Sequence, residues 1–194
     1  VGLGVGAAAG HLEADDRARF FEIDPAVAAL ARAHFGYLAG AEGRVEVVTG
    51  DARVALEREA ARGAAPYDLL LVDAFSGDAI PTHLLTVEAL RLYRDRLAEG
   101  GVLLMHVSNR FYDLRPVIRA GATRLGLAGV HVARVHDLAR DQDPAQYVAL
   151  ARDAARLAPL RARGWSRLDA GGLGAVTPWT DDHVHVLEAL RPAL

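Results

Sequence analysis

The stretch that decides the fold is Tyr67-Asp68-Leu69-Leu70-Leu71-Val72-Asp73-Ala74-Phe75-Ser76-Gly77-Asp78-Ala79-Ile80-Pro81, an apolar run that ends in an acid and a polar loop. A run of this kind is typical of a buried parallel strand, and α/β sheets bind their ligands beyond the carboxyl ends of such strands. We therefore predict that Asp73 is a site residue. The alternative is that Asp73 only caps the turn that follows the strand.

Two earlier predicted strands share this feature of an acid at the carboxyl end. The strand predicted over 18–23 carries Glu22 near its end, and the strand predicted over 44–49 is followed by Asp51. Helical segments separate the strands, which is the pattern of a doubly wound α/β sheet of Rossmann-like type with mostly parallel strands. Three successive strands that end in acids are more than a structural role requires, so we predict a ligand site at this edge.

Several local signals predict where the elements begin and end. Asp24 and Pro25 predict the start of a helix that runs to about residue 35, because Asp is a good N-cap and Pro suits the first helical position. Thr86 predicts the cap of a helix that continues to Ala98 and ends at Glu99-Gly100-Gly101. We also expect strands over 102–107, 130–135 and 147–151, with the last two forming an antiparallel C-terminal hairpin, and helices over 52–62, 114–126 and 183–190.

The first residues contain a glycine turn, Gly2-x-Gly4-x-Gly6, at the end of an expected strand. Glycines at this spacing let a backbone approach a ligand closely. Glu22 follows Gly2 by about 20 residues, the spacing at which a strand-end carboxylate meets the ribose of a nucleoside. A dinucleotide usually requires a third glycine where this chain has Ala7, and two acids, Glu22 and Asp51, suit an adenosyl-sulfonium cofactor better. We favour the sulfonium cofactor and keep the dinucleotide as the alternative.

Composition excludes several classes of function. Apolar residues make up 52% of the 194 residues, enough for a well-buried core, and the formal net charge of -3 argues against binding of nucleic acid. All 22 basic residues are Arg, which removes a Schiff-base or P-loop lysine, and the lack of Cys removes disulfides and thiolate chemistry. We expect a single cytoplasmic domain over 1–194, without direct membrane contact, although it could be the cytoplasmic domain of a membrane protein. The chain begins at Val1 without Met, which we interpret as a fragment that lacks its upstream part.

Six motifs together carry a resemblance to a known family: Gly2-Leu3-Gly4-Val5-Gly6, Phe21-Glu22-Ile23-Asp24-Pro25, Gly50-Asp51-Ala52-Arg53, Val72 to Pro81, His106-Val107-Ser108-Asn109-Arg110 and Trp179-Thr180-Asp181-Asp182. The chain resembles the spermidine synthase-like (polyamine aminopropyltransferase) superfamily along nearly its whole length. It is most similar to the bacterial branch that is fused to a membrane transporter-like region.

The resemblance implies a fold of S-adenosylmethionine-dependent methyltransferase type and a nucleoside sulfonium cofactor, either decarboxylated S-adenosylmethionine or S-adenosylmethionine itself. It implies that Glu22 holds the ribose hydroxyls and Asp51 the adenine amino group, with Gly2, Gly4, Gly6 and Ala52 completing the cofactor cradle. Asp73 takes the place of the catalytic acid that orients and deprotonates the attacking amine. Such an acid suits the chemistry, because a protonated amine cannot attack carbon until it loses a proton.

The acceptor implied is a small-molecule di- or polyamine, and a homodimer is compatible with the resemblance. Asp78, Asp181 and Asp182 would supply negative charge for this cation. For Asp181 and Asp182, the alternative is an N-cap pair at the start of the helix expected after them.

Three departures bear on the reaction. The true synthases carry acids where this chain has Val5 and Ser76, and they possess an N-terminal β-domain that this sequence lacks. We expect an aminopropyltransferase-like enzyme, with a methyltransferase that uses S-adenosylmethionine, favoured by Val5, as the runner-up. A non-catalytic nucleoside- or polyamine-sensing domain attached to a transporter is the third hypothesis.

The histidines give no metal site. His83 and His106 lie beside the predicted site, where each could be a base or a hydrogen-bond partner, but we favour a structural role. His183 and His185 are two apart, and on the helix expected there they would not share a face. We therefore expect no metal.

Overall fold

The computed structural model describes residues 1–74, 81–134, 144–169 and 174–191. The chain divides into two compact units, Val1–Ala64 and Ala65–Leu194, each of which is described by itself below. Whether they act as the single domain expected from the sequence stays a prediction. No helix in the described ranges is both long enough and apolar enough to cross a membrane.

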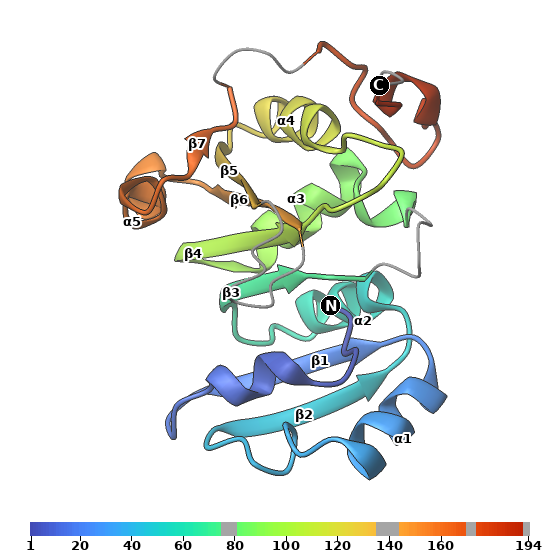
Figure 1. Ribbon diagram of the computed structural model, residues 1–194, viewed down its shortest axis with the longest axis vertical. Helices are drawn as coiled ribbons and strands as arrows, with labels where there is room; N and C mark the ends of the chain where they lie inside the picture. The colour runs from blue at the N-terminus through green and yellow to red at the C-terminus, as the bar shows by residue number, and fades with distance from the viewer. Residues whose placement is uncertain (75–80, 135–143, 170–173, 192–194) are drawn as a thin grey trace. The chain divides into compact units, whose positions relative to one another are not determined.

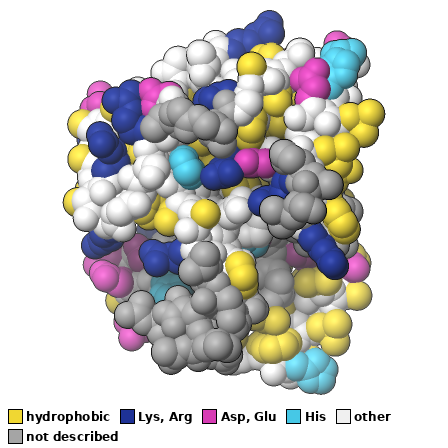
Figure 2. All heavy atoms as spheres, turned by 45° about the horizontal axis from the view of Figure 1, so that its top comes forward, with side chains coloured by type: hydrophobic (Ala, Val, Ile, Leu, Met, Phe, Trp, Pro, Cys, Tyr) yellow, Lys and Arg dark blue, Asp and Glu magenta, His cyan; other side chains and the backbone are white. Residues whose placement is uncertain are grey.

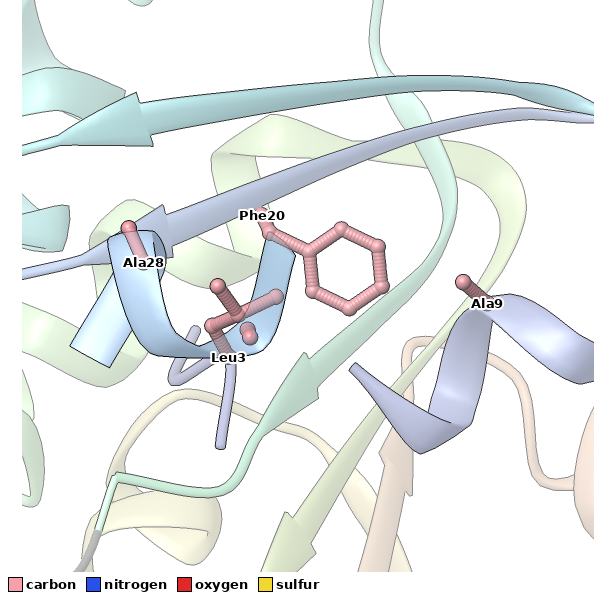
Figure 3. Close-up of a cluster of buried hydrophobic side chains, with 5 residues drawn as sticks. Leu3, Ala9, Phe20 and Ala28 are labelled. Atoms are coloured by element: carbon pink, nitrogen blue, oxygen red, sulfur yellow. The ribbon is translucent and has the colours of Figure 1, made fainter. Parts of the chain in front are cut away.

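The first unit is a two-stranded parallel sheet with helices (Figure 1). Its elements are η1 (Ala7–His11), β1 (Arg17–Glu22), α1 (Pro25–His34), β2 (Arg44–Thr49) and α2 (Ala52–Ala61). The core unites the glycine turn, η1, β1 and α1 through the side chains of Leu3, Ala9, Phe20 and Ala28, all of which are drawn in Figure 3, and that of Ala31. The predicted helix caps are confirmed, because the Asp24 side chain accepts a hydrogen bond from the backbone N–H of Ala26 and Pro25 is the first helical residue.

The second unit contains a five-stranded sheet in the order β3-β4-β6-β5-β7. Its elements are β3 (Tyr67–Val72), η2 (Thr82–Leu84), α3 (Val87–Arg96), β4 (Leu97–His106), α4 (Arg115–Arg124), β5 (Ala128–Arg134), β6 (Ala145–Ala151), η3 (Ala154–Leu157), α5 (Ala158–Ala162), β7 (Ser166–Arg167) and η4 (Val186–Ala189). Strands β3 and β4 are parallel, whereas β6 is antiparallel to both of its neighbours, β4 and β5. The expected antiparallel hairpin is confirmed, and its second strand is inserted between β4 and β5.

Both faces of this sheet are covered. Helices α3 and α4 contact the strands and each other, and Gly121 of α4 lies so close to α3 that a Cβ there would come within 2.6 Å of Leu90. On the other face, Val130 and Ala149 pack with Leu157 of η3 in a buried cluster. The sheet is therefore a middle layer.

The expected helix over 86–98 is correct at its start and wrong at its end. Thr86 caps α3, with its hydroxyl oxygen accepting a hydrogen bond from the backbone N–H of Ala89. The helix ends at Arg96, because Leu97 takes an extended conformation and pairs with Tyr67 of β3. Gly101 therefore lies inside β4, where a Cβ would be 2.7 Å from the carbonyl oxygen of Tyr67. This glycine permits a close strand contact and does not terminate a helix.

Two other predictions, a helix over 183–190 and a strand at the first residues, are wrong. No helix spans 183–190, because Thr180 and His183 exchange backbone hydrogen bonds of 2.9 and 3.1 Å, and only the short η4 follows. No strand is formed by the first residues, although the Gly2 N–H donates to the carbonyl of Phe21 at 2.9 Å.

The surface carries charges of both signs. Figure 2 shows one face of the molecule, on which arginine side chains in dark blue and acidic side chains in magenta are interspersed. Arg19 illustrates the mixture, since it pairs with both Glu46 and Glu59.

Candidate functional site

The glycine turn of the first unit has a backbone that only glycine adopts readily. Gly2, Gly4 and Gly6 have φ angles of 83°, 54° and 83°, in the left-handed region that other residues rarely occupy. A Cβ at Gly4 would meet no atom within 4 Å, so the space outside this residue is open. The backbone of the turn is therefore accessible at Gly4, and its contact with a ligand stays a prediction.

Glu22 is a buried acid that fastens this turn to the end of β1. Glu22 is only 8% exposed, and its two carboxylate oxygens accept hydrogen bonds from the backbone N–H groups of Leu3 and Asp24, each at 3.0 Å. A carboxylate offers about four lone-pair sites, so two remain for hydroxyl donors. The geometry is compatible with the expected ribose contact, which stays a prediction, and it adds a structural role that the sequence did not indicate.

Asp51 lies at the same edge of the first sheet as Glu22. Residue 50 links the two strand ends, because the Gly50 N–H donates to the Glu22 carbonyl at 2.8 Å. The Asp51 carboxylate accepts the Val54 N–H at 3.0 Å and so caps α2, whose first residue, Ala52, is buried. The structure thus brings the glycine turn, Glu22 and Asp51 together, while the contact of Asp51 with adenine stays a prediction.

In the second unit, Asp73 is held by a histidine from the neighbouring strand. Val72 pairs with Met105 in the parallel register of β3 and β4, so the next residues, Asp73 and His106, are neighbours. The Asp73 Oδ1 atom lies 2.8 Å from His106 Nδ1, with side chains 47% and 23% exposed respectively. Asp73 therefore interacts across the sheet, whereas the turn that it would cap lies outside the described residues.

Ser108 extends this interaction on the other side of the imidazole. His106 Nε2 lies 2.7 Å from the Ser108 hydroxyl oxygen, which also accepts the Gln146 N–H at 2.8 Å. The Ser108 hydroxyl proton is therefore best directed at Nε2, which assigns the proton of the neutral imidazole to Nδ1, facing Asp73. The imidazole therefore donates to the Asp73 carboxylate from Nδ1 while Nε2 accepts from Ser108, which fixes the orientation of the ring.

Tyr147 closes the group from the other flank of β4. It is the antiparallel partner of His106, and the two rings stack with centroids 4.9 Å apart and planes at 28°. Burial, together with the negative charge of Asp73, raises the pKa of the Tyr147 phenol. Three strands thus contribute to one polar cluster, with Asp73 from the end of β3, His106 from the end of β4 and Tyr147 from the start of β6.

The structure places Asp181 and Asp182 outside this cluster of contacts. The Thr86 hydroxyl donates to Asp181 Oδ1 at 2.7 Å, and the Asp181 N–H donates to Glu88 at 3.1 Å, which ties the segment to the start of α3. The alternative that the pair caps a following helix is wrong, because no helix begins there. Asp182 is exposed, and a contact of either acid with substrate stays a prediction.

Other predicted residues have simpler outcomes. Asp78 and Ser76 lie outside the described residues. His83 is exposed. His183 and His185 lie on no helix, and their rings meet edge to face with centroids 4.1 Å apart, so the expectation that they point apart is wrong. Within the described ranges, no group of three or more His, Asp or Glu side chains could hold a metal ion.

Sequence reasoning undervalued His106 and did not single out Ser108, Gln146 or Tyr147. One signal was available, because residues two apart in a strand share a face, which places His106 and Ser108 together. The contribution of Tyr147 depends on which strand lies beside β4, and no local pattern shows this.

Comparisons with known proteins agree with the fold. No protein-family model matches the chain. Human methyltransferase-like protein 13, solved in complex with SAH, superposes with a TM-score of 0.58 at 20% identity, covering 95% of this chain and 84% of that one. Spermidine synthase from Thermotoga maritima superposes with a TM-score of 0.53 at 14% identity, covering 91% and 57%. The fold is therefore a Rossmann-like methyltransferase fold.

A match in sequence is more specific. The polyamine aminopropyltransferase of Vibrio vulnificus (strain CMCP6) is 36% identical over 118 residues, which cover 58% of this chain and 38% of that protein. The chain thus matches well under half the length of this curated relative. The chain is thus similar in sequence to part of this relative and has a methyltransferase-type fold. The expected fusion to a transporter-like region stays a prediction.

Proposed function

We propose that this chain is a transferase that moves an alkyl group from an adenosyl-sulfonium donor to the nitrogen of an amine. The observation that carries the proposal is the pairing of Asp73 with His106 at 2.8 Å, on the edge of a methyltransferase-type sheet where ligands bind. A partly exposed carboxylate backed by an imidazole can attract an ammonium ion and accept its proton.

The first unit carries the residues that fit the donor. The glycine turn offers open backbone at Gly4, and Glu22 and Asp51 stand together at the adjoining strand ends. The Glu22 lone pairs not used by Leu3 and Asp24 suit two neighbouring hydroxyls. The complex of human methyltransferase-like protein 13 with SAH supports a donor of this chemical class. When bound, such a donor supplies a carbon attached to positively charged sulfur, and this carbon is readily attacked by a nucleophile.

The residues of the second unit would act on the acceptor. The amine first loses a proton to the Asp73 carboxylate, while the Nδ1–H of His106, whose ring is held by Ser108, orients this carboxylate. The nitrogen then forms its bond to carbon as the carbon–sulfur bond breaks, and the bonding electron pair stays on sulfur. Alignment supplies most of the remaining rate enhancement in an inline displacement of this type.

Two forms of this reaction are open to test. The name of the Vibrio vulnificus relative supports transfer of an aminopropyl group from decarboxylated S-adenosylmethionine to a di- or polyamine. In this form Asp78, Asp181 and Asp182 would attract the cationic acceptor. Val5 favours the second form, methyl transfer from S-adenosylmethionine, because this residue of the glycine turn is 40% exposed and offers no carboxylate to an aminopropyl amine.

The experiment is calorimetric titration of the chain with S-adenosylmethionine, its decarboxylated form and methylthioadenosine, followed by product analysis by mass spectrometry with an amine acceptor. Methylthioadenosine among the products would identify aminopropyl transfer, and S-adenosylhomocysteine would identify methyl transfer. Binding of none of the three nucleosides would refute the proposal in both forms.

A further inference from the structure

A pocket of about 440 Å³ opens in the second unit where β4 and β5 end and β6 begins. This volume lies within the range of small-molecule sites, roughly 300–1,000 Å³. The residues that line it are Ser108, Asn109, Arg110, Arg134, Pro144, Ala145, Gln146 and Arg191. Three of these described lining residues are arginines and none is acidic, so the described part of the lining is positively charged.

The three arginines come from separate parts of the chain. Arg134 is the last residue of β5 and pairs with Ala145 of β6, and Arg110 lies over the ring of Phe111 at 5.6 Å. Arg191 is fixed from two sides, since its Nε donates to the Tyr112 carbonyl and its Nη2 to Gln146 Oε1, each at 3.1 Å. A guanidinium held in this way is oriented before any ligand arrives.

These charges are not neutralised by the acids that the structure describes. Neither Arg110 nor Arg134 forms an ion pair with another described residue. The acid whose pKa responds to Arg191 is Asp113, and this carboxylate is already bound in bidentate fashion by Arg115, at 2.8 and 2.6 Å. Like charges around one pocket repel each other, and a carboxylate or phosphate would relieve this repulsion while matching the planar fork of arginine.

The pocket and the Asp73 group belong to one hydrogen-bonded network. Ser108 lines the pocket and also bonds to His106, the partner of Asp73. The Gln146 N–H donates to Ser108, and the side chain of the same Gln146 accepts from Arg191. A ligand that reaches Asp73 at one end could therefore place an anionic group against the arginines at the other.

We propose that the acceptor is an amine that also carries an anionic oxygen group, a carboxylate or a phosphate, bound by Arg110, Arg134 and Arg191. This inference rests on the proposed amine-alkylating function and replaces the plain di- or polyamine as its acceptor. A second ammonium group would be repelled by the pocket, whereas an anionic group is attracted, so the pocket selects by charge among amines of similar length.

The test is calorimetric binding of three probes of similar length to the intact chain: 4-aminobutanoate, 3-aminopropyl phosphate and 1,4-diaminobutane. We expect at least one anionic amine to bind about tenfold or more tightly than the diamine, as charge-assisted bonds to arginine allow. We expect Arg134→Gln and Arg110→Gln each to weaken this binding about tenfold. Arg124→Gln, at an exposed position at the end of α4, is the matched control and should change nothing.

The outcomes separate this inference from the proposed function. Equal or tighter binding of 1,4-diaminobutane, or unchanged binding in both pocket variants, overturns the inference even if the donor binds. Binding of an anionic amine that depends on Arg134 supports the pocket even if no adenosyl donor binds, in which case only the proposed function fails. Circular dichroism of each variant confirms that a loss of binding does not reflect unfolding.

Discussion

The carboxylate of Asp73 lies 2.8 Å from the imidazole of His106, and the two residues occupy corresponding places at the ends of adjacent parallel strands. The arrangement orients the acid without removing it from solvent, since the Asp73 side chain remains 47% exposed. An acid in this setting is accessible to a substrate while the imidazole fixes its orientation.

Replacing Asp73 tests its role as the base. Asp73→Asn keeps the size of the side chain and removes the charge, and we expect the transfer rate to fall by about 10²–10⁴-fold. Donor affinity should be unchanged, because the residues assigned to the donor lie in the first unit. Asp95→Asn is the control, an exposed acid of α3 that pairs with its neighbour Arg94. A rate for Asp73→Asn equal to that of the control would remove Asp73 from this role.

Ser108→Ala tests the support of His106. The substitution removes the hydroxyl that bonds to His106 and leaves the part-buried Gln146 N–H without this acceptor. We expect the free energy of unfolding to fall by about 1 kcal/mol and the transfer rate to fall severalfold with little change in donor affinity. Ser108→Thr, which keeps a hydroxyl, should retain most of both. Equal losses in the two variants would show that packing, not the hydroxyl, matters here.

Glu22→Gln probes the fastening of the glycine turn. The amide keeps one acceptor oxygen but presents an NH2 group to one of the two backbone N–H donors, from Leu3 or Asp24. We expect a loss of about 1–3 kcal/mol in stability, measured by urea denaturation, together with weaker donor binding. Glu46→Gln on the adjacent strand β2 is the control, because its ion pair with Arg19 is on the surface and contributes little. Full stability of Glu22→Gln would contradict the structural role.

Thr86→Ala examines a residue that both caps α3 and holds Asp181. Loss of the cap should destabilise the chain by about 0.5–2 kcal/mol, and the bond of the Thr86 hydroxyl to Asp181 at 2.7 Å is lost as well. Thr86→Ser preserves the hydroxyl and should behave much like the unaltered chain in thermal denaturation. If Ser and Ala destabilise equally, the methyl group of Thr86 is responsible instead.

Asp113 provides a prediction about pH. Burial opposes its ionisation, but the hydrogen bonds and charge of Arg115, aided by the charge of Arg191, outweigh burial and lower the pKa of Asp113. A carboxyl whose pKa is lower in the folded chain adds stability above its unfolded pKa, about 3.9, and loses it as pH falls through the folded pKa. Asp113→Asn should therefore be less stable than the unaltered chain at pH 7, with the difference shrinking toward pH 2.

The control for Asp113 is a second bidentate pair of the same sequence spacing. Asp169 binds Arg167 at 2.8 and 2.5 Å, but both side chains are about 60% exposed. Solvent screens such a pair, so Asp169→Asn should have little effect on stability at any pH. Equal pH dependence in the two variants would refute the importance of burial.

Local signals in the sequence were sufficient to predict most helices and strands. They were insufficient to predict which of these elements pack or pair with each other. The caps at Asp24 and Thr86 and the carboxyl ends of β1, β2 and β3 follow from residue types and hydrophobic pattern. The predicted end of α3 was wrong because Leu97 pairs with Tyr67, and this contact between distant residues overrides helix propensity. The helix expected over 183–190 is absent for a similar reason, since the backbone N–H and C=O of His183 both bond to the backbone of Thr180.

In the candidate site, too, single residues were predictable from the sequence and their partners from other strands were not. Glu22, Asp51 and Asp73 were predictable as strand-end acids, and their contacts with donor and acceptor stay predictions. The imidazole beside Asp73 required the register of β3 and β4, and Tyr147 required the insertion of β6 next to β4. The arginine pocket could not be found from sequence, because Arg110, Arg134 and Arg191 are scattered among 22 basic residues and come together only in the fold.

The reversed direction of β6 has a consequence for how such a protein can change its acceptor. A parallel strand in this place would begin at the far edge of the sheet, but β6 begins where β4 and β5 end, and so delivers Gln146 and Tyr147 to the polar edge. Substitutions at this one strand start could therefore alter the choice of acceptor while Gly4, Glu22 and Asp51 keep the donor unchanged, which makes acceptor and donor recognition separately evolvable.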